Sequence, residues 1–306
     1  MTENVTACAN CGKGEEASSN LKTCTACKSV KYCSRECQIA HRPQHKKACK
    51  NRAAELHDEK LFKQPPPEED CPICFLRLPY LESGSTYMPC CGKELCTGCV
   101  HAFQSRITKR KDDKCPFCRA PTPKSDEEII KRLEKRMELN DAKAIYNMAC
   151  HYCNGSFGLP RDHAKALELW QRAAELGNAD AICNVANAYY RGVGVEVDKK
   201  KAKHYAELAA IEGEAKARYN MGVTEVNSGN YNRALKHFMI AARDGYINSL
   251  EGIQIMYKHG DATKDDYAKA LRSYRAFLDE IKSDQRDEAA TSREEYRYYE
   301  STLRRE

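Results

Sequence analysis

The spacing of apolar residues in the second half of the chain predicts amphipathic helices. The stretch SDEEIIKRLEKRMELN begins with Ser125, which has capping-box spacing to Glu128, so a helix is expected to start here. The apolar residues of this stretch recur at helical intervals along one face: Ile129, Ile130, Leu133 and Met137. A longer pattern that repeats itself follows this first helix.

Three consecutive segments, beginning at Ala144, Ala181 and Ala217, align with one another. Each holds a pair of adjacent alanines followed by a glycine, and the pairs lie 36 and then 32 residues apart: 173/174 with Gly177, 209/210 with Gly213, and 241/242 with Gly245. Two amphipathic helices and a glycine-bearing turn per copy predict stacked helical hairpins, because one hairpin cannot bury its own apolar face. A fourth, degenerate copy runs through KDDYAKALRSYRAFLDEI.

The repeated segments resemble Sel-one-like repeats, relatives of the tetratricopeptide repeat, and the resemblance covers residues 141–281. It implies an all-α helical-hairpin solenoid that acts as a protein-binding scaffold. The alternative is a solenoid that only spaces or stabilises other parts of the chain.

Composition favours an intracellular, water-soluble protein. The chain has 306 residues, of which 42% are hydrophobic and 31% charged, and this length suits two or three folded units. No apolar run reaches the roughly 18 residues needed to cross a bilayer, and the opening MTENVTACAN lacks a secretory signal. We therefore expect a cytoplasmic and/or nuclear location without a membrane partner. No phosphate-binding glycine loop or serine nucleophile elbow indicates the corresponding enzyme classes.

The cysteines indicate metal chemistry. Of the 18 cysteines, 15 precede residue 119, and in a reducing compartment metal thiolates are a better use for them than disulfides. If these 15 bind four Zn²⁺ ions as thiolates, sulfur and metal together contribute −7, and the formal net charge of +6 becomes about −1. The charge therefore gives no reason to expect a nucleic-acid partner.

Between residues 8 and 49 the spacing is C-x2-C-x12-C-x2-C-x5-C-x3-C-x7-H-x3-C, which supplies eight ligands for two tetrahedral zinc sites. Two-residue gaps form knuckles in which backbone N–H groups bond to sulfur. The three-residue gaps in CSREC and HKKAC are expected to put both ligands on one face of a helix. Because the stretch is too short to fold on apolar burial alone, metal binding is expected to supply its folding free energy.

This block resembles the MYND finger residue by residue, including Tyr32 just before Cys33. The resemblance implies two interleaved structural zinc sites and a partner protein that supplies a short, often proline-containing peptide. The implied ligand sets are Cys8, Cys11, Cys33 and Cys37 on one ion and Cys24, Cys27, His45 and Cys49 on the other. His41 lies four residues after Cys37 and competes with His45 for the histidine position.

The second cysteine block contains CPIC, PCCGKELCTGC and CPFC between residues 71 and 118. It resembles a RING finger in an all-cysteine form, which implies two crossed zinc sites and an expected total of four ions. The implied sets are Cys71, Cys74, Cys96 and Cys99 on one ion and Cys90, Cys91, Cys115 and Cys118 on the other. RING fingers commonly have a histidine where this chain has Lys93. Either the adjacent Cys90 and Cys91 share one zinc, or His101 replaces one of them.

A redox dithiol is the alternative for the last pair, CPFC, but the region lacks the strand and helix of a thioredoxin-like fold. In RING-type ubiquitin ligases, a cation directly after the last ligand bridges the conjugating enzyme and its ubiquitin. The resemblance therefore marks Ile73, Pro116 and Arg119 as candidate contacts with a conjugating enzyme. Alternatively, Arg119 is an ordinary exposed residue. The loop from Val100 to Lys114 also lacks the tryptophan that many active RING fingers use at this contact.

Three cysteines and two charged segments remain outside these sites. Cys150 and Cys153 fall inside the first repeat and Cys183 inside the second, where helix-packing positions are expected instead of another knuckle. KRKDDK at 109–114 is expected to be a solvated loop, because its acidic residues weaken any contact with phosphate. The tail SREEYRYYESTLRRE is expected to form an amphipathic helix or to stay partly disordered.

The sequence thus predicts a multidomain chain with two small zinc-stabilised fingers followed by an all-α solenoid. The expected parts are a MYND finger at 8–49, a linker at 50–70, a RING-type finger at 71–118, a linker and capping helix at 119–140, Sel-one-like repeats at 141–281 and a charged tail at 282–306. The predicted function is that of a RING-type ubiquitin ligase without a covalent catalytic residue, which recruits substrates through its MYND finger and repeats. The alternatives are a non-enzymatic adaptor or scaffold and a transcriptional co-regulator.

Overall fold

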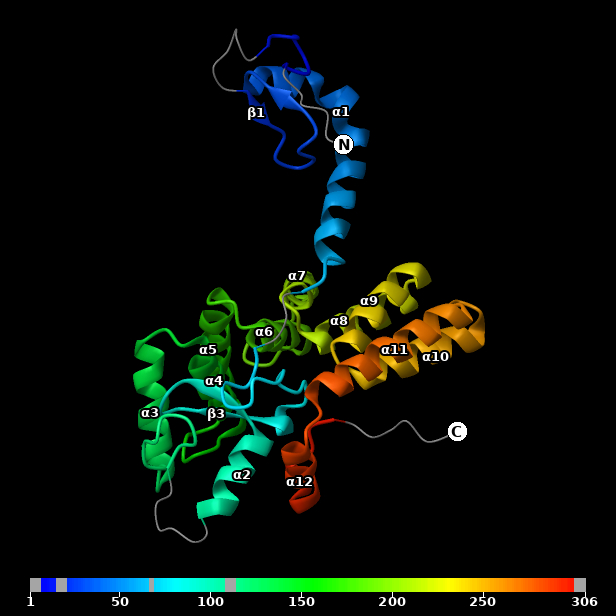
Figure 1. Ribbon diagram of the computed structural model, residues 1–306. Helices are drawn as coiled ribbons and strands as arrows, with labels where there is room; N and C mark the ends of the chain where they lie inside the picture. The colour runs from blue at the N-terminus through cyan, green and yellow to red at the C-terminus, as the bar shows by residue number, and fades with distance from the viewer. Residues whose placement is uncertain (1–6, 15–20, 66–68, 108–113, 300–306) are drawn as a thin grey trace. The chain divides into compact units, whose positions relative to one another are not determined.

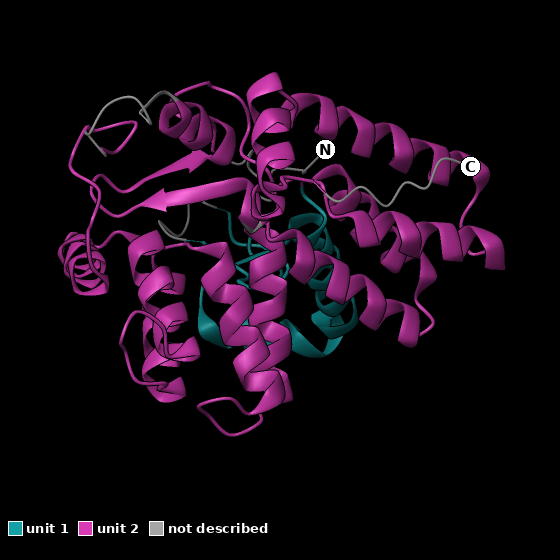
Figure 2. Cartoon of the chain, turned by 90° about the horizontal axis from the view of Figure 1, so that it is seen from below, with its two compact units in different colours: residues 1–63 teal, residues 64–306 magenta. Residues whose placement is uncertain are grey.

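The computed structural model describes residues 7–14, 21–65, 69–107 and 114–299. The chain divides into two compact units, residues 1–63 and 64–306, which Figure 2 shows in different colours. Most of KRKDDK and the end of the predicted tail lie outside the described residues. Among the described helices, none is long and apolar enough to cross a membrane.

The first unit combines a small finger with a long helix. Strand β1 (Lys22–Thr23) pairs antiparallel with β2 (Lys31–Tyr32), and helix α1 (Arg35–Leu61) follows (Figure 1). Ser34 caps this helix, because its hydroxyl accepts the backbone N–H of Cys37 at 3.2 Å. The buried cluster of the finger consists of three cysteines and one tyrosine, so it contains almost no ordinary apolar core.

Helix α1 differs from the sequence predictions in two respects. It continues past Cys49 to Leu61, through most of the segment predicted as a linker, because this stretch is rich in Ala, Glu and Lys and contains no helix breaker. In addition, Cys33 precedes the cap residue Ser34, so CSREC spans the start of the helix instead of lying on one of its faces. HKKAC lies within the helix, as predicted.

The second unit begins with a finger of two strands and a helix. After the short 3₁₀ helix η2 (Glu82–Gly84), strand β3 (Ser85–Met88) pairs antiparallel with β4 (Lys93–Cys96), and helix α2 (Thr97–Ile107) follows directly. Residues 71–118 are called the second finger below, and residues 8–49 the first finger.

Helix α3 (Asp126–Glu138) begins where the sequence predicts it. The hydroxyl of Ser125 accepts the backbone N–H of Glu128 at 3.3 Å and so caps the helix. Leu133 is buried, and the other apolar residues of the predicted face pack against the same core.

Four helical hairpins follow α3 and form the body of the second unit (Figure 1). Their helices are α4 (Ala142–Asn154), α5 (His163–Glu175), α6 (Ala179–Arg191), α7 (Lys199–Ile211), α8 (Ala215–Asn227), α9 (Tyr231–Arg243), α10 (Ile247–His259) and α11 (Lys264–Ile281). The three turns between hairpins contain Gly177, Gly213 and Gly245, each with a positive φ that favours glycine. Gly245, for example, has φ of 92°, and a Cβ there would lie 2.3 Å from the ring of Phe277. The fourth, degenerate repeat also forms a hairpin, which consists of α10 and α11.

The described part of the predicted charged tail is folded. Helix α12 (Asp284–Ser292) packs against α2 of the second finger, and the short 3₁₀ helix η3 (Glu294–Tyr296) follows it. Tyr298 is buried, and its hydroxyl donates to Asp287. This segment belongs to the second unit because α12 packs on the second finger. The local sequence pattern does not indicate this contact.

Candidate metal centres and the docked second finger

The structure gathers the predicted ligands of the first finger into two groups. One group contains Cys8, Cys11, Cys33 and Cys37, and the other contains Cys24, Cys27, His45 and Cys49; within each group the ligand atoms all lie within 4.8 Å of one another. The Sγ atoms of Cys11 and Cys33 are 3.5 Å apart, and those of Cys24 and Cys49 are 3.7 Å apart.

His45 is the histidine of the second group, and the competing His41 lies outside it. Nε2 of His45 is 3.2 Å from Sγ of Cys27, whereas Nδ1 of His41 is 3.1 Å from the hydroxyl of Tyr32. The two imidazole rings are stacked with their centres 5.6 Å apart. His41 and Tyr32 therefore support the ring of His45 from outside the ligand group.

The second finger also holds two groups of four, and the groups are crossed along the chain. Cys71 and Cys74 meet Cys96 and Cys99, while Cys90 and Cys91 meet Cys115 and Cys118. Representative Sγ–Sγ distances are 3.8 Å for Cys74 and Cys96 and 3.4 Å for Cys118 and Cys90. The first and third pairs of ligands thus share one site, and the second and fourth pairs share the other.

The adjacent cysteines 90 and 91 both belong to one group because the chain turns sharply around them. The backbone N–H groups of Cys91 and Gly92 both donate to the carbonyl oxygen of Met88, at 3.2 and 2.8 Å, and Gly92 has φ of 69°. His101, the alternative ligand, lies on α2 outside the group, with its ring centre 6.2 Å from that of Tyr296.

The spacing of the sulfur atoms tests whether these groups fit a metal. A zinc–sulfur distance of about 2.3 Å in a tetrahedron corresponds to sulfurs about 3.8 Å apart, while a disulfide needs about 2.05 Å. The sulfur pairs quoted above lie 3.4–3.8 Å apart, and none of the 18 cysteines forms a disulfide. Soft thiolate and imidazole ligands in groups of four suit Zn²⁺. All four positions of each group are protein atoms, so such an ion is structural.

A left-handed residue closes four of the five two-residue cysteine pairs, whereas the fifth pair, Cys96 and Cys99, is followed by Val100 within α2. Gly12, Lys28, Phe75 and Arg119 directly follow the second cysteine of their knuckles, and their φ values are 72°, 55°, 58° and 65°. The backbone N–H of each residue donates to the carbonyl oxygen of the first cysteine, at 2.8–3.0 Å. The positive φ of Arg119 is therefore a property of the knuckle.

The three candidate contacts for a conjugating enzyme lie on the first and last knuckles of the second finger. Ile73 is 37% exposed, Pro116 is partly buried and Arg119 is exposed. The guanidinium of Arg119 lies over the ring of Phe103 on α2, 4.8 Å from its centre. Phe75 on the first knuckle is 77% exposed, which no pattern in the sequence indicates.

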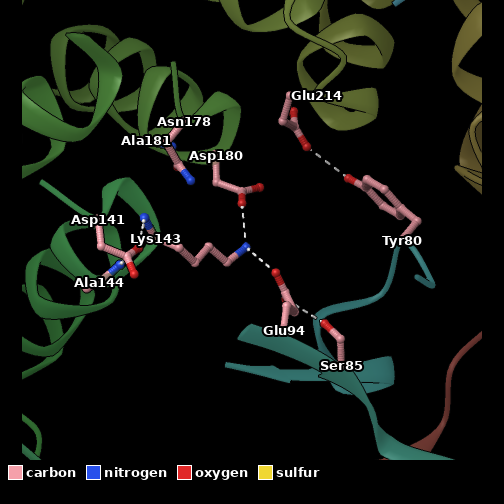
Figure 3. Close-up of polar contacts among 10 residues, drawn as sticks. All are labelled: Tyr80, Ser85, Glu94, Asp141, Lys143, Ala144, Asn178, Asp180, Ala181 and Glu214. Atoms are coloured by element: carbon pink, nitrogen blue, oxygen red, sulfur yellow. Dashed lines mark hydrogen bonds and ion pairs between the residues drawn. The ribbon is translucent and has the colours of Figure 1, made fainter. Parts of the chain in front are cut away.

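The second finger is docked against the first three hairpins through polar side chains (Figure 3). Nζ of Lys143 on α4 lies 3.4 Å from Oε2 of Glu94 on β4 and 3.1 Å from Oδ2 of Asp180 on α6. The hydroxyl of Tyr80 donates to Oε1 of Glu214 at 3.0 Å. Tyr87 on β3 likewise donates to Asp141 at 2.8 Å.

Two of these docking residues, Asp141 and Glu214, also cap helices of the hairpins. Asp141 and Glu214 accept backbone N–H groups at the starts of α4 and α8, and Asn178 does so at the start of α6. A cavity of about 590 Å³ lies along this row of helix starts, with the second finger as its other wall. No local sequence signal identifies Tyr80 or Lys143 as docking residues, because their partners are far away along the chain.

Burial and charge set the protonation of this docking surface. Burial alone would lower the pKa of the Lys143 ammonium, but Asp180 and Glu94 more than offset this and raise it above its ordinary value. Burial, and then the carboxylate of Glu214, raise the pKa of the Tyr80 hydroxyl. At neutral pH, Lys143 is therefore a cation and Tyr80 a hydrogen-bond donor.

The remaining cysteines lie in helices of the repeats. Cys150 and Cys153 are on α4 and pack against the core of the first hairpins, and Cys183 is buried on α6. Sγ of Cys153 is 3.7 Å from Nδ1 of His163. None of the three belongs to a metal-ligand group among the described residues.

These features define a protein with a cysteine-rich, zinc-binding N-terminal region followed by a helical-repeat solenoid. Family comparison identifies the parts: residues 8–49 match the MYND finger, and residues 142–178, 179–214 and 215–246 each match the Sel1 repeat. The chain therefore contains a MYND finger and three Sel1 repeats. Both are protein-interaction modules, so protein partners follow from them.

Curated relatives share only part of the chain. Chitin synthase regulatory factor 4 of Schizosaccharomyces pombe is 28% identical over 135 residues, which is 44% of this chain and 21% of that protein. ERAD-associated E3 ubiquitin-protein ligase component HRD3B of Arabidopsis thaliana is 31% identical over 115 residues, or 37% and 18%. E3 ubiquitin-protein ligase GW2 of Oryza sativa is 35% identical over 68 residues, or 22% and 15%. The similarity thus spans about a fifth or less of each relative.

Solved structures resemble the chain over about half its length. A Sel1 repeat protein from Oxalobacter formigenes matches with a TM-score of 0.44 and 28% identity, covering 50% of this chain and 64% of that structure. The protective antigen c5321 of uropathogenic Escherichia coli matches with the same TM-score and 25% identity, covering 51% of this chain and 35% of that structure.

Proposed function

We propose that this protein is a RING-type ubiquitin ligase whose MYND finger and Sel1 repeats recruit the target protein. The observation that carries the proposal is the crossed arrangement of two four-cysteine groups in the second finger, with Ile73 and Arg119 exposed on its first and last knuckles. The partial similarity to GW2 and to the ligase component HRD3B adds support from two distant relatives.

In this proposal the second finger acts by positioning. Its zinc ions are structural, because protein atoms occupy every ligand position, and no protein cysteine carries ubiquitin. The exposed knuckles bind a charged conjugating enzyme, and Arg119 restrains the ubiquitin joined to it. Fixing a flexible donor in an attack-ready pose lowers the activation barrier without a nucleophile from the ligase. We further propose four zinc ions, two per finger, and a cytoplasmic and/or nuclear location, where thiols stay reduced.

The test is autoubiquitination by the full chain with purified activating enzyme, a panel of conjugating enzymes, ubiquitin and ATP. We expect ubiquitin conjugates from the parent protein and at least a ten-fold loss of rate in Ile73→Ala and Arg119→Ala. Arg191→Ala, which removes an exposed arginine at the end of α6, serves as the matched control and should keep the parent rate. A parent protein that carries its zinc but forms no conjugates with any enzyme of the panel would contradict the proposal.

One observation favours a second candidate, a non-enzymatic adaptor. The guanidinium of Arg119 already lies on the ring of Phe103, so the cation has a partner within the finger. An adaptor of this kind would bind its partners through the first finger and the repeats and use the second finger for structure alone. The ubiquitination assay separates the two, because an adaptor gives no conjugates while it still captures its protein partners.

A further inference from the structure

Helix α12 approaches the second finger closely enough to form part of it. Gly98 on α2 faces α12, and a Cβ on this glycine would lie 2.8 Å from both Cγ and the backbone nitrogen of Arg286. The amide oxygen of Gln285 lies 3.8 Å from Sγ of Cys99. Arg286 itself is completely buried, at 0% exposure. Helix α12 thus reaches the Cys71–Cys74–Cys96–Cys99 group.

The guanidinium of Arg286 forms hydrogen bonds with the backbone that directly follows the first knuckle of the second finger. Nη1 donates to the carbonyl oxygens of Arg77 and Ile281, at 2.8 and 2.6 Å. Nη2 donates to the carbonyl oxygen of Leu76 at 3.4 Å and lies 3.8 Å from Sγ of Cys74. One side chain therefore connects α12 to a metal ligand and to the backbone just beyond it.

The buried positive charge of Arg286 needs a negatively charged partner. A buried guanidinium without a counter-charge is strongly destabilising. Within the described chain, Arg286 makes no ion pair with a carboxylate, and its hydrogen-bond acceptors are three carbonyl oxygens and Sγ of Cys74. Cys74 is the only one of these groups that can become negatively charged. Four thiolates around Zn²⁺ carry a net charge of −2, which supplies the missing counter-charge.

We propose that Arg286 is the outer-shell partner of the metal site formed by Cys71, Cys74, Cys96 and Cys99. It donates a charge-assisted N–H···S hydrogen bond to Cys74 and fixes the loop that presents Ile73 and Phe75. Helix α12 is then a component of the second finger. This inference rests on the proposed zinc occupancy of the second finger and is independent of ligase activity.

The experiment compares metal release from the full-length parent protein, Arg286→Met and Arg286→Lys. Each zinc-loaded protein is mixed with excess chromophoric chelator, and the first finger of the same chain serves as the internal standard. Loss of outer-shell partners typically weakens metal binding by about 10–100-fold. In Arg286→Met we therefore expect one metal equivalent to leave at least about ten-fold faster than in the parent, with the first-finger metals unchanged. Arg286→Lys, which keeps the charge but not the planar fork, should lie between them.

Cobalt substitution distinguishes a role at the metal site from a role in packing alone. A lost N–H···S bond changes electron density on sulfur, so the sulfur-to-cobalt charge-transfer band of Co²⁺-loaded Arg286→Met should shift, and Arg286→Lys should restore it in part. Parent-like release and an unshifted band in Arg286→Met would overturn the proposal. If that variant does not fold, Gly98→Ala, which displaces Arg286 without removing it, must show faster release of one metal equivalent. A parent protein without metal in the second finger would overturn the zinc occupancy itself.

Discussion

The hydroxyl of Tyr80 in the second finger donates to Oε1 of Glu214, which caps α8 in the third hairpin, at 3.0 Å. The two residues are 134 positions apart in the sequence. Burial raises the pKa of the Glu214 carboxyl, while the hydrogen bonds from Ala217 and Tyr80 act in the opposite direction. This pair joins the finger to the repeats, and its removal should weaken the whole second unit.

Tyr80→Phe should destabilise the second unit by about 1–3 kcal/mol, because Oε1 of the buried Glu214 carboxylate loses one of its two donors and keeps only the backbone N–H of Lys216. Urea unfolding of the zinc-loaded protein measures the change. Tyr190→Phe removes a hydroxyl from a tyrosine that is 64% exposed and should be nearly neutral. Equal midpoints for the two variants would show that the Tyr80–Glu214 contact does not hold the finger in place.

Lys28→Gly should stabilise the first finger. Lys28 closes a knuckle with φ of 55°, and a left-handed conformation costs a residue with a Cβ about 1–2 kcal/mol. Glycine removes this cost, but its greater freedom in the unfolded chain lowers stability by about 0.4–1 kcal/mol. The free energy of unfolding should therefore rise by about 0.5–1 kcal/mol. The matched control is Lys22→Gly in β1, which removes the same charge from a strand and should be destabilising. Thermal unfolding of the zinc-loaded protein checks the opposite signs.

Removal of zinc should unfold the fingers and spare most of the helical hairpins. The cores of the hairpins contain no proposed metal ligand, whereas the buried cluster of the first finger is mainly cysteine. After chelation, hydrogen exchange should rise throughout residues 8–49 and 71–107, while α4–α11 keep their protection and most of the helical circular dichroism remains. A single transition that removes all helical signal on chelation would contradict this prediction.

The burial of His151 predicts a pH dependence. Burial lowers the pKa of this imidazole, so the folded protein favours its neutral form. The contribution of neutral His151 to stability is complete above the unfolded-state pKa of about 6.5 and is lost as the pH falls from there through the lower folded-state pKa. His151→Gln, which cannot titrate, should lose less stability than the parent between pH 7.5 and 5.5. The comparison uses unfolding midpoints at each pH, so acid effects on the zinc ligands are common to both proteins.

Local patterns in the sequence predict those parts of the fold that local geometry determines. The two-residue knuckles place Cys71 beside Cys74 and Cys115 beside Cys118, and the Ser125–Glu128 spacing gives the start of α3. The fold class and the MYND and Sel1 assignments are confirmed. For the metal sites, the resemblance also gives the pairing of knuckles, which spacing alone leaves open.

Contacts between distant segments could not be predicted in this way. The partner of Tyr80 lies 134 residues away, and the partners of Arg286 in the second finger lie more than 200 residues away, so no periodicity connects them. For this reason the sequence predicts the segment at 282–306 only as a charged tail, whereas the structure shows that it contains α12, which covers the second finger. The extension of α1 to Leu61 did have a local signal, because the segment is rich in helix formers, but the proline run beyond it suggested a linker.

The position of Arg286 beyond the four described hairpins affects the order in which the second finger is assembled. During synthesis, all ligands of the first finger have emerged once Cys49 is free of the ribosome, so this finger can take up its ions early. The cysteines of the second finger emerge next, but Arg286 follows only after all four hairpins have been translated. Because chains fold from their N-terminal end as they emerge, the second finger completes its outer shell only after the hairpins have been made.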